Sequence, residues 1–249
     1  MQIEISTLSN TGGRATNEDA AGFWSDAGNC YCIVSDGAGG HGGGDVASRL
    51  AVTIVLEMFQ HRPECSGEAI AAALDAANEA VIARAATEER LANMRATAVV
   101  LCCDVVHGGA AWGHIGDSRL YYFRDQRIAQ QTRDHSVVQN MVDAGYIRAE
   151  ALRRAPHRSQ LFAALGERDE FSPAYGHAEI AEGDAFLLCT DGVWEHVTEP
   201  EFEQMLSQAN CAAEWLAHIE SKLLSQDRAQ LDNFSALAVC CRPSHAAHE

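Results

Sequence analysis

The sequence is short of lysine and proline, and it has no long apolar segment. Lys222 is the only lysine among 18 basic residues, and proline occurs five times in 249 residues. With only 20 glycines besides, the composition excludes collagenous and low-complexity chains. No apolar run approaches the roughly 18 residues needed to cross a bilayer, and residues 1–13 show no basic stretch followed by an apolar one. We therefore expect a cytoplasmic protein that does not insert into membranes.

Positive charge is scarce as well. The 18 Lys and Arg residues stand against 35 Asp and Glu residues, which gives a formal net charge of -17 at pH 7. A field of that sign repels nucleic acid backbones and anionic lipid surfaces. We therefore expect no nucleic acid among the partners.

Paired cysteine motifs are missing. The nine cysteines include no CxxC pair, and two adjacent pairs, Cys102-Cys103 and Cys240-Cys241, lie inside apolar runs. This arrangement is typical of buried thiols in a reducing compartment.

The apolar content is that of a globular chain. Hydrophobic residues make up 47% of the sequence and charged residues 21%, which is enough to form a sizeable core. No internal repeat or linker divides the chain. We expect a single domain over residues 1–242, followed by a frayed tail at residues 243–249.

Apolar periodicity predicts that strands and helices each come in adjacent pairs. Short alternating or continuous apolar runs predict strands at 3–8, 20–24, 30–35, 97–103, 110–115, 120–123, 127–131, 174–179, 185–189 and 235–241. Helical spacing predicts helices at 46–59, 68–94, 137–144, 199–207 and 212–226. This order argues against a parallel βαβ sheet. It favours an α+β fold in which two antiparallel β-sheets pack as a sandwich and are flanked by helix pairs, in αββα layers.

Acidic residues recur at the ends of the predicted strands. They are Glu18, Asp19, Asp36, Asp117, Asp191 and Asp232. A single Asp-Gly pair, such as Asp36-Gly37, is better explained as an ordinary turn. Several carboxylates at one sheet edge, however, would repel one another by about 1 to 4 kcal/mol per close pair. A hard divalent cation such as Mg²⁺ or Mn²⁺ would remove that cost, whereas zinc would favour His and Cys ligands.

Five short motifs carry a resemblance to a known family. In chain order they are Arg14-Ala-Thr-Asn17-Glu18-Asp19, Ser35-Asp36-Gly37-Ala38-Gly39-Gly40-His41, Gly116-Asp117-Ser118-Arg119, Cys189-Thr190-Asp191-Gly192-Val193-Trp194 and Asp232-Asn233-Phe234-Ser235. Each motif is weak alone. Their order and approximate spacing, from about residue 10 to 241, resemble the metal-dependent protein phosphatase 2C (PPM) family of serine/threonine phosphatases, in its bacterial single-domain form. The resemblance implies a β-sandwich flanked by helices.

The resemblance also implies a binuclear Mn²⁺ or Mg²⁺ centre. Asp36 would bridge the two ions. The Gly37 carbonyl and Glu18 would complete one site, and Asp191 and Asp232 the other. A water bridging the ions would become a hydroxide aimed in line at phosphorus, so no protein nucleophile is needed.

Three further residues receive roles by the same resemblance. Asp19 would hold waters bound to the metal ions, and Asp117 would bind a third, weaker ion together with Asp191. Arg14 would grip the substrate phosphate and neutralise charge on its oxygens.

One position departs from the family pattern. Some members carry a histidine directly after the Asp-Gly of the second motif, where this chain has Ala38. His41, three residues further on, is the nearest imidazole that could protonate the leaving oxygen. A water bound to a metal ion is the alternative acid, and we favour it.

The segment 134–166 resembles the flap of bacterial family members. It contains four arginines, Arg148, Arg153, Arg154 and Arg158. The segment reads either as a solvated surface loop or as a receiver for a phosphopeptide, since local arginines stand out in so acidic a chain. We slightly favour the substrate-binding role.

These observations predict a monomeric enzyme that removes phosphate from Ser or Thr of phosphorylated proteins and opposes a bacterial Ser/Thr kinase. Two alternatives stay open. One is a catalytically silent relative that binds phosphoprotein as a regulator, against which the presence of every metal-ligand position and Arg14 argues. The other is an enzyme that keeps the site but acts on small phosphoesters.

Overall fold

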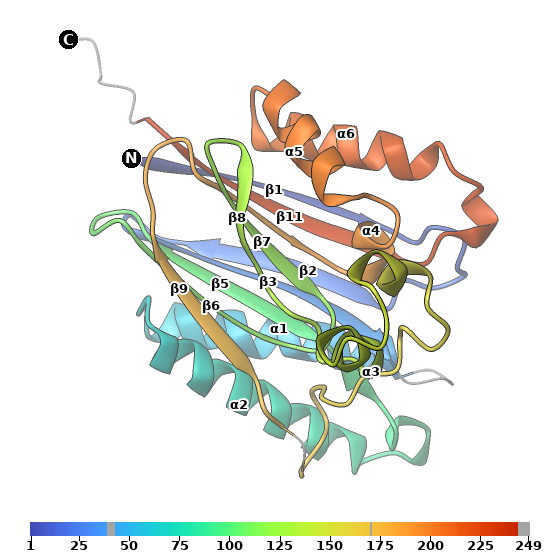
Figure 1. Ribbon diagram of the computed structural model, residues 1–249. Coiled ribbons are helices and arrows are strands. Elements are labelled where there is room, and N and C mark those ends of the chain that lie inside the picture. Colours follow the sequence, from blue (N-terminus) through green and yellow to red (C-terminus); the bar gives the residue numbers. More distant parts are fainter. Residues whose placement is uncertain (39–42, 170, 244–249) are drawn as a thin grey trace.

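Two β-sheets face each other across an apolar interior in the computed structural model, and helices cover the outer face of each sheet (Figure 1). The structure describes residues 1–38, 43–169 and 171–243. His41 and the predicted tail from residue 244 onwards lie outside these residues. Within the described ranges, no helix combines the length and apolar character that a membrane crossing requires.

The first sheet has five strands in the order β1-β11-β10-β7-β8, and every neighbouring pair is antiparallel. Its strands are β1 (Gln2–Asn10), β7 (Arg119–Arg124), β8 (Arg127–Gln131), β10 (Ala185–Cys189) and β11 (Phe234–Arg242). The sheet therefore joins the first strand of the chain to its last.

The second sheet has six strands in the order β2-β3-β5-β6-β9, with β4 paired to the end of β3. Its strands are β2 (Asp19–Ser25), β3 (Asn29–Ala38), β4 (Arg95–Ala96), β5 (Ala98–Asp104), β6 (Gly109–Ile115) and β9 (Ala174–Glu179). These pairs are also antiparallel, as the apolar pattern predicts.

A helix pair covers the second sheet. In α1 (Gly44–His61) the buried residues recur at helical spacing, and in α2 (Gly67–Ala85) the Ser66 hydroxyl caps the first turn by accepting a hydrogen bond from the Ala69 amide. The outer face of the first sheet is covered by α4 (Asp191–Trp194), α5 (Glu199–Gln208) and α6 (Ala212–Leu224). The core thus has three layers, one under each helix group and one between the sheets.

The prediction of one helix over 68–94 is wrong in its last third. Helix α2 ends at Ala85, and a short 3₁₀ turn, η1 (Glu89–Leu91), follows. The chain turns back because Leu91 and Met94 are buried against the core, and β4 must then pair with β3. Ala-rich sequence without glycine or proline carried no local sign of this turn.

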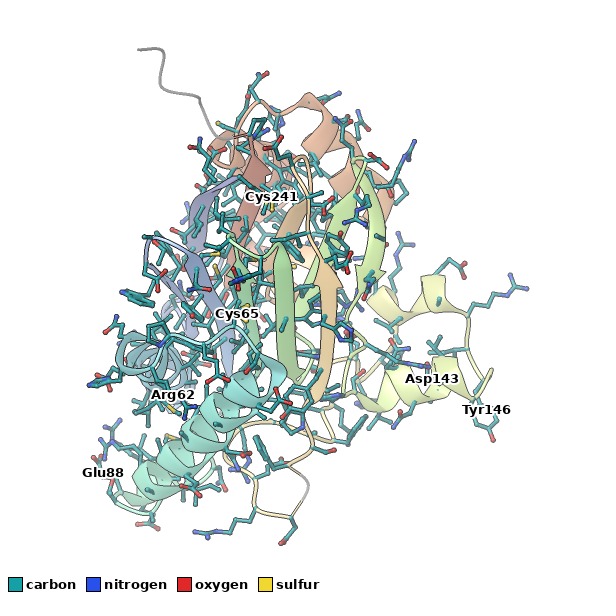
Figure 2. The ribbon with its side chains drawn as sticks, turned by 90° about the vertical axis from the view of Figure 1, so that its left-hand side faces the viewer. Arg62, Cys65, Glu88, Asp143, Tyr146 and Cys241 are labelled. Atoms are coloured by element: carbon teal, nitrogen blue, oxygen red, sulfur yellow. The ribbon has the colours of Figure 1, made fainter. Side chains whose placement is uncertain are left out.

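A flap leaves one sheet and returns to the other. It contains α3 (Val137–Asp143) and the 3₁₀ turn η2 (Ala149–Arg154). Its neck is closed by backbone hydrogen bonds from Val137 N to Gln160 O (2.9 Å) and from Phe162 N to His135 O (3.0 Å). Figure 2 shows Asp143 and Tyr146 projecting at the edge of the molecule, away from the sheets.

Seven of the nine cysteines are buried, and Cys65 and Cys211 are half-buried. All nine are free thiols, as the sequence predicts. Cys30 and Cys103 lie opposite each other on β3 and β5, so part of the layer between the sheets is lined by sulfur.

Candidate metal centre

Asp36 lies near the end of β3 and is half-buried. The strand continues to Ala38, so Asp36 lies within the strand, two residues before its end. The prediction that Asp36 follows the strand is therefore wrong. Its partner across the β2–β3 ladder is Asp19, the first residue of β2. Two acidic residues from different motifs are therefore held side by side by backbone pairing.

Gly37 stands where no side chain fits. A Cβ atom at this position would lie 2.0 Å from the Gly44 carbonyl oxygen and 2.7 Å from the Glu18 carbonyl oxygen. The Gly37 amide donates to the Glu18 carbonyl at 3.1 Å, and the Ser48 hydroxyl donates to the same oxygen at 2.5 Å. The first two acidic motifs are thus fastened together through Glu18.

Asp117 follows β6 through Gly116, which adopts a φ of +96°. A residue with a side chain would be strained there, so glycine permits the turn. Asp117 is buried, and its carbonyl accepts a hydrogen bond from the Trp194 indole at 2.9 Å. Burial, together with the charge of Asp134, raises the pKa of Asp117 to about 7, against the opposing effect of Arg119.

Asp191 begins the single turn of α4, directly after β10. The sequence predicts the strand and its end but not this turn, because four residues are too few to show helical spacing. The pKa of Asp191 is raised well above its usual value, first by burial and then by the charges of Asp117, Glu195, Asp19 and Asp232.

Asp232 and Arg14 form an ion pair with an N–O distance of 2.7 Å. Both side chains are substantially exposed, at 45% and 63%. The next residue, Asn233, holds the loop of the first motif, because its side chain accepts from the Glu18 amide (2.8 Å) and donates to the carbonyls of Thr11 (3.0 Å) and Thr16 (2.9 Å).

The predicted carboxylates act on one another. Burial raises the pKa of Asp36 well above its usual value, and the charges of Asp191, Asp19, Asp117 and Asp232 raise it further. Five of the six predicted acidic positions therefore lie close enough for mutual repulsion. Burial raises the pKa of Glu18, and the charges of Asp45, a residue not predicted, and of Asp232 raise it further, while Arg14 lowers it.

The chemistry of this group fits hard divalent cations. The donors are carboxylate and carbonyl oxygens, which Mg²⁺ and Mn²⁺ prefer. One oxygen of Asp19, Oδ1, is buried and has no hydrogen-bond partner, while Oδ2 accepts from the Thr190 hydroxyl at 2.9 Å. A buried acceptor without a partner is costly, and a cation or the water around it would satisfy it.

The described carboxylates do not form a ready set of ligands around one metal position. In the described part of the chain, no three His, Cys, Asp or Glu side chains are gathered in the way that one metal ion requires. Arg14 holds Asp232 to one side, and carboxylates without a counter-ion repel one another.

Sequence reasoning missed the residues that hold these acids in place. Thr97, Ser118, Asn233 and Thr190 hydrogen-bond to the acidic residues or to their neighbours. Three of them stand inside or beside the quoted motifs, so the motifs offered a signal. Thr97 offered none, since a threonine at the start of a predicted strand is ordinary.

One flap arginine lies next to the acidic cluster, which is formed by Asp19, Asp36, Asp117, Asp191 and Asp232. Arg158 forms two bonds with the Glu195 carboxylate, one of them between Nη2 and Oε2 at 2.7 Å. This hydrogen bonding raises the pKa of Arg158, and the negative charges of Asp191 and Asp232 add to the effect. Arg158 is thus a flap arginine close enough to the predicted metal ligands for their charge to raise its pKa.

The other flap arginines differ from it. Arg153 donates to the Glu199 carboxylate (2.6 Å) and to the Val197 carbonyl (3.1 Å), so it fastens η2 to the α5 side. Arg148 and Arg154 are exposed. The base of the flap is fixed by Asp134, which forms a buried two-bond pair with Arg119 at 2.7 and 2.8 Å.

Two histidines, His114 and His135, form a pair that the sequence did not predict. The rings of His114 and His135 stack at 4.7 Å. His114 is buried, and its Nε2 bonds to the Arg133 carbonyl at 2.8 Å, as expected for a structural histidine. Burial, and then the neighbouring His114, lower the pKa of His135 to about 4.

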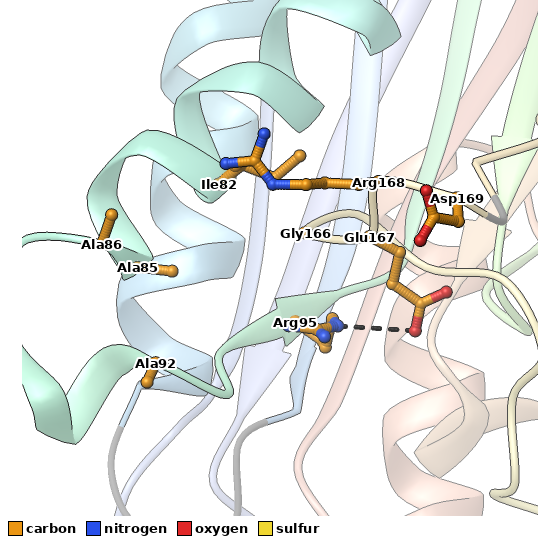
Figure 3. Close-up of a pocket in the computed structure, with 9 residues that line it drawn as sticks. All are labelled: Ile82, Ala85, Ala86, Ala92, Arg95, Gly166, Glu167, Arg168 and Asp169. Carbon is orange, nitrogen blue, oxygen red and sulfur yellow. Dashed lines mark hydrogen bonds and ion pairs between the residues drawn. The ribbon is translucent and has the colours of Figure 1, made fainter.

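A cavity of about 550 Å³ lies between the end of α2, β4 and residues 166–169 (Figure 3). Its walls come from the end of α2, from Arg95 of β4, and from the flap exit at residues 166–169. Arg95 faces Glu167 across it, with an N–O distance of 3.4 Å. None of the predicted metal ligands lines this cavity.

A second, larger cleft of about 950 Å³ separates the flap from the start of α5. It is lined by several paired charges, among them Arg119, Arg153, Glu199 and Lys222. Both hollows border the flap, since Gly166 lines the first and Arg153 the second.

Two packed antiparallel sheets with acidic residues gathered at one edge are typical of a metal-dependent phosphatase of the sandwich type. Residues 9–216 match the model of the protein phosphatase 2C family, and the chain belongs to that family.

Relatives support this assignment. Serine/threonine protein phosphatase PstP of Mycobacterium tuberculosis is 35% identical over 191 residues, which cover 75% of this chain and 35% of PstP. The chain thus spans about a third of the length of that relative. Protein phosphatase PhpP of Streptococcus pneumoniae is 29% identical over 222 residues, which cover 82% of this chain and 85% of PhpP.

A solved structure matches almost the whole chain. The catalytic domain of PstP in complex with two manganese ions superposes with a TM-score of 0.81 at 27% identity, over 97% of this chain and 99% of that one. The expected fold of two antiparallel sheets and flanking helices is thereby confirmed.

Proposed function

We propose that this protein hydrolyses phosphoserine and phosphothreonine in proteins and opposes a Ser/Thr kinase. The observation that carries the proposal is the convergence of acidic residues on Asp36 from four other sequence motifs. Family membership and the manganese-bound relative support it. Phosphorylated proteins, including the kinase itself, would be the partners.

The acidic cluster, together with Glu18, would hold two Mn²⁺ or Mg²⁺ ions. Asp36 would contact both ions, with Glu18 and the Gly37 carbonyl on one side and Asp191 and Asp232 on the other. When bound, such a pair of ions lowers the pKa of a water towards neutrality and neutralises phosphoryl charge. The chain's own contribution is to hold hard oxygen donors at fixed strand ends.

Asp19 and Asp117 would act around this pair. Asp19 has a buried free oxygen that can accept from a water, and Thr190 fixes its other oxygen. Asp117, whose charge raises the pKa of Asp191, would share a third and weaker ion with it.

Arg14 would bind the phosphate of the substrate. Its guanidinium is exposed and lies at the acidic edge through its pair with Asp232. An exposed ion pair of this kind is worth only about 0 to 1 kcal/mol, so a phosphate can replace the carboxylate as its partner. The planar fork of arginine suits two phosphate oxygens.

The flap would receive the rest of the phosphoprotein. Arg158 stands next to the acidic cluster, and exposed apolar side chains lie on and near α3, namely Val137, Met141, Tyr146 and Phe162. A substrate that places its phosphate near Arg14 would therefore find both charge and apolar surface on the flap.

Hydrolysis of a phosphothreonine peptide, measured by phosphate release with Mn²⁺ and with chelator, tests the proposal. We expect turnover only with metal, and none in Asp36→Asn. The matched control is Asp125→Asn, an exposed carboxylate in the β7–β8 turn at the far end of the sheet, which should keep full activity.

The same assay separates the alternatives. A regulator without activity would bind the phosphopeptide but release no phosphate at any metal concentration. A small-phosphoester phosphatase would prefer metabolites to phosphopeptides by kcat/KM. Either result would overturn the proposed function.

A further inference from the structure

Thr97 interrupts the strand pairing at the residue opposite Asp36. The β3–β5 ladder pairs Val34 with Val99, and the β3–β4 ladder pairs Gly37 with Ala96, so the common register places Asp36 opposite Thr97. The Thr97 amide donates to the Asp36 carbonyl at 2.8 Å, as a regular ladder requires.

The return bond is made by a side chain. The Asp36 amide donates to the Thr97 hydroxyl at 2.9 Å, and the Thr97 carbonyl accepts instead from the Ser35 hydroxyl at 2.6 Å. A hydroxyl therefore replaces a backbone acceptor at the position of the proposed bridging carboxylate. Ser35 and Thr97 are buried, so bulk water cannot hydrogen-bond to their hydroxyls or to the Thr97 carbonyl.

The same hydroxyl reaches a second acidic motif. Thr97 Oγ1 and Ser118 Oγ share a hydrogen bond of 2.6 Å, and Ser118 directly follows the buried Asp117. On its other side the Thr97 methyl group packs on Gly116, where an added Cβ would lie 2.6 Å from it. Thr97 thus contacts Gly116 and Ser118, the residues on both sides of Asp117.

We infer that Thr97 is a positioning residue, whose hydroxyl sets the spacing between Asp36 and Asp117 and so prepares the acidic edge for divalent cations. The inference rests on the proposed function. One oxygen atom holds the main chain of one acid and the loop of the other. Losing it would free the Asp36 amide and the Ser118 hydroxyl at the same time.

Calorimetric titration with Mn²⁺, a readout independent of turnover, tests this role in three variants. Thr97→Val keeps the shape but removes the hydroxyl, and we expect Mn²⁺ affinity to fall by about 10- to 100-fold, the usual cost of losing a group that orients a metal ligand. Thr97→Ser keeps the hydroxyl, so its affinity should stay within about threefold of wild type. Ser118→Ala leaves the bond to Asp36, so it should weaken only the binding phase that Asp117→Asn removes.

Thr53→Val is the matched control, because its hydroxyl donates to the Arg49 carbonyl on the exposed side of α1. It should bind Mn²⁺ as wild type does. Melting with chelator separates positioning from packing: if Thr97→Val and Thr97→Ser melt alike and bind Mn²⁺ alike, the hydroxyl sets no spacing and the inference is wrong. Ser118→Ala with wild-type titration in every phase would refute the link to Asp117. If wild type itself binds Mn²⁺ but releases no phosphate from phosphopeptides, the proposed function fails while the Thr97 comparison still holds.

Discussion

Asp19 and Asp36 lie directly opposite each other on neighbouring strands, so backbone hydrogen bonds hold two like charges together. Like charges at such positions destabilise a sheet. Burial raises the pKa of both carboxyls, to about 6 for Asp19 and well above the usual value for Asp36. The fold thus keeps a repulsion that a proton or a cation would relieve.

The first prediction concerns the stability of the metal-free protein. The folded-state pKa of Asp19 is about 6, above its ordinary 3.8, so the folded state binds the proton more tightly. This contribution to stability is complete below pH 3.8 and is lost as pH rises through about 6. With chelator, Asp19→Asn should therefore be more stable than wild type at pH 7.5, by at most roughly 3 kcal/mol, and the difference should vanish near pH 4.

Urea unfolding at a series of pH values measures this difference. Asparagine keeps an acceptor for the Thr190 hydroxyl, so the substitution isolates the charge. An Asp19→Asn variant that is less stable than wild type at pH 7.5 in chelator would show that the carboxylate is stabilising, against the prediction.

The second prediction is that divalent metal stabilises the fold. At free Mn²⁺ of about 100 times Kd, one site adds roughly 2.7 kcal/mol. For a chain of this size that is a Tm increase of roughly 5 to 10 °C. Asp232→Asn should show a smaller increase, and its chelated form should melt no lower than wild type.

Monovalent salt is the control for this experiment, because it also screens the net charge of -17. An equal Tm with chelator and with millimolar Mn²⁺, at matched ionic strength, would count against a metal site at this edge.

The third prediction separates two roles of Arg14. Arg14 now pairs with Asp232, so Arg14→Ala should free this carboxylate and raise Mn²⁺ affinity by a few-fold, in line with the value of an exposed pair. Catalysis at saturating Mn²⁺ should nevertheless fall strongly. Arg14→Lys should also lose kcat/KM, because lysine lacks the fork that grips two oxygens. Weaker metal binding with normal catalysis in both variants would reverse the assignment.

The fourth prediction concerns substrate selection by the flap. Arg158→Ala should raise KM for a phosphothreonine peptide several-fold while leaving hydrolysis of p-nitrophenyl phosphate nearly unchanged, because the small substrate does not reach the flap. Arg148→Ala is the matched control, because Arg148 is another exposed arginine of the same flap. An equal loss on both substrates would place Arg158 with the phosphate and not with the peptide.

The sequence was sufficient for most of the fold because each sheet is antiparallel and built from short, strongly apolar strands. The ten predicted strands are all present, with ends that differ by a few residues. The missing elements are the shortest, β4 and α4, since two and four residues cannot show a period. The end of α2 was missed because tertiary burial of Leu91 and Met94, not a local stop signal, determines it.

The gathering of the acidic residues could be expected from the sequence, but the residues that hold them in place could not. Asp36 and Asp191 could be recognised in the sequence because each follows an apolar run. The structure brings them close enough for the charge of Asp191 to raise the pKa of Asp36. Their exact chemical roles stay predictions. Thr97 could not be found, because its importance comes from a register between strands whose residues lie 61 positions apart in the chain.

The closed neck of the flap has a consequence for how such proteins diversify. The bonds from the Val137 amide to the Gln160 carbonyl and from the Phe162 amide to the His135 carbonyl close the flap at its base, and the Ala96–Leu165 bridge anchors its exit to the second sheet. Within the flap, Val138 and Leu152 are buried in the core, and Arg153 and Arg158 pair with Glu199 and Glu195, so these residues tie the flap to the rest of the chain. The exposed positions between them, such as Arg148 and Arg154, can be exchanged without disturbing the strands that carry the acidic residues. Changes at those exposed positions would alter the surface that the flap presents to a partner while the strands beneath it keep their pairing.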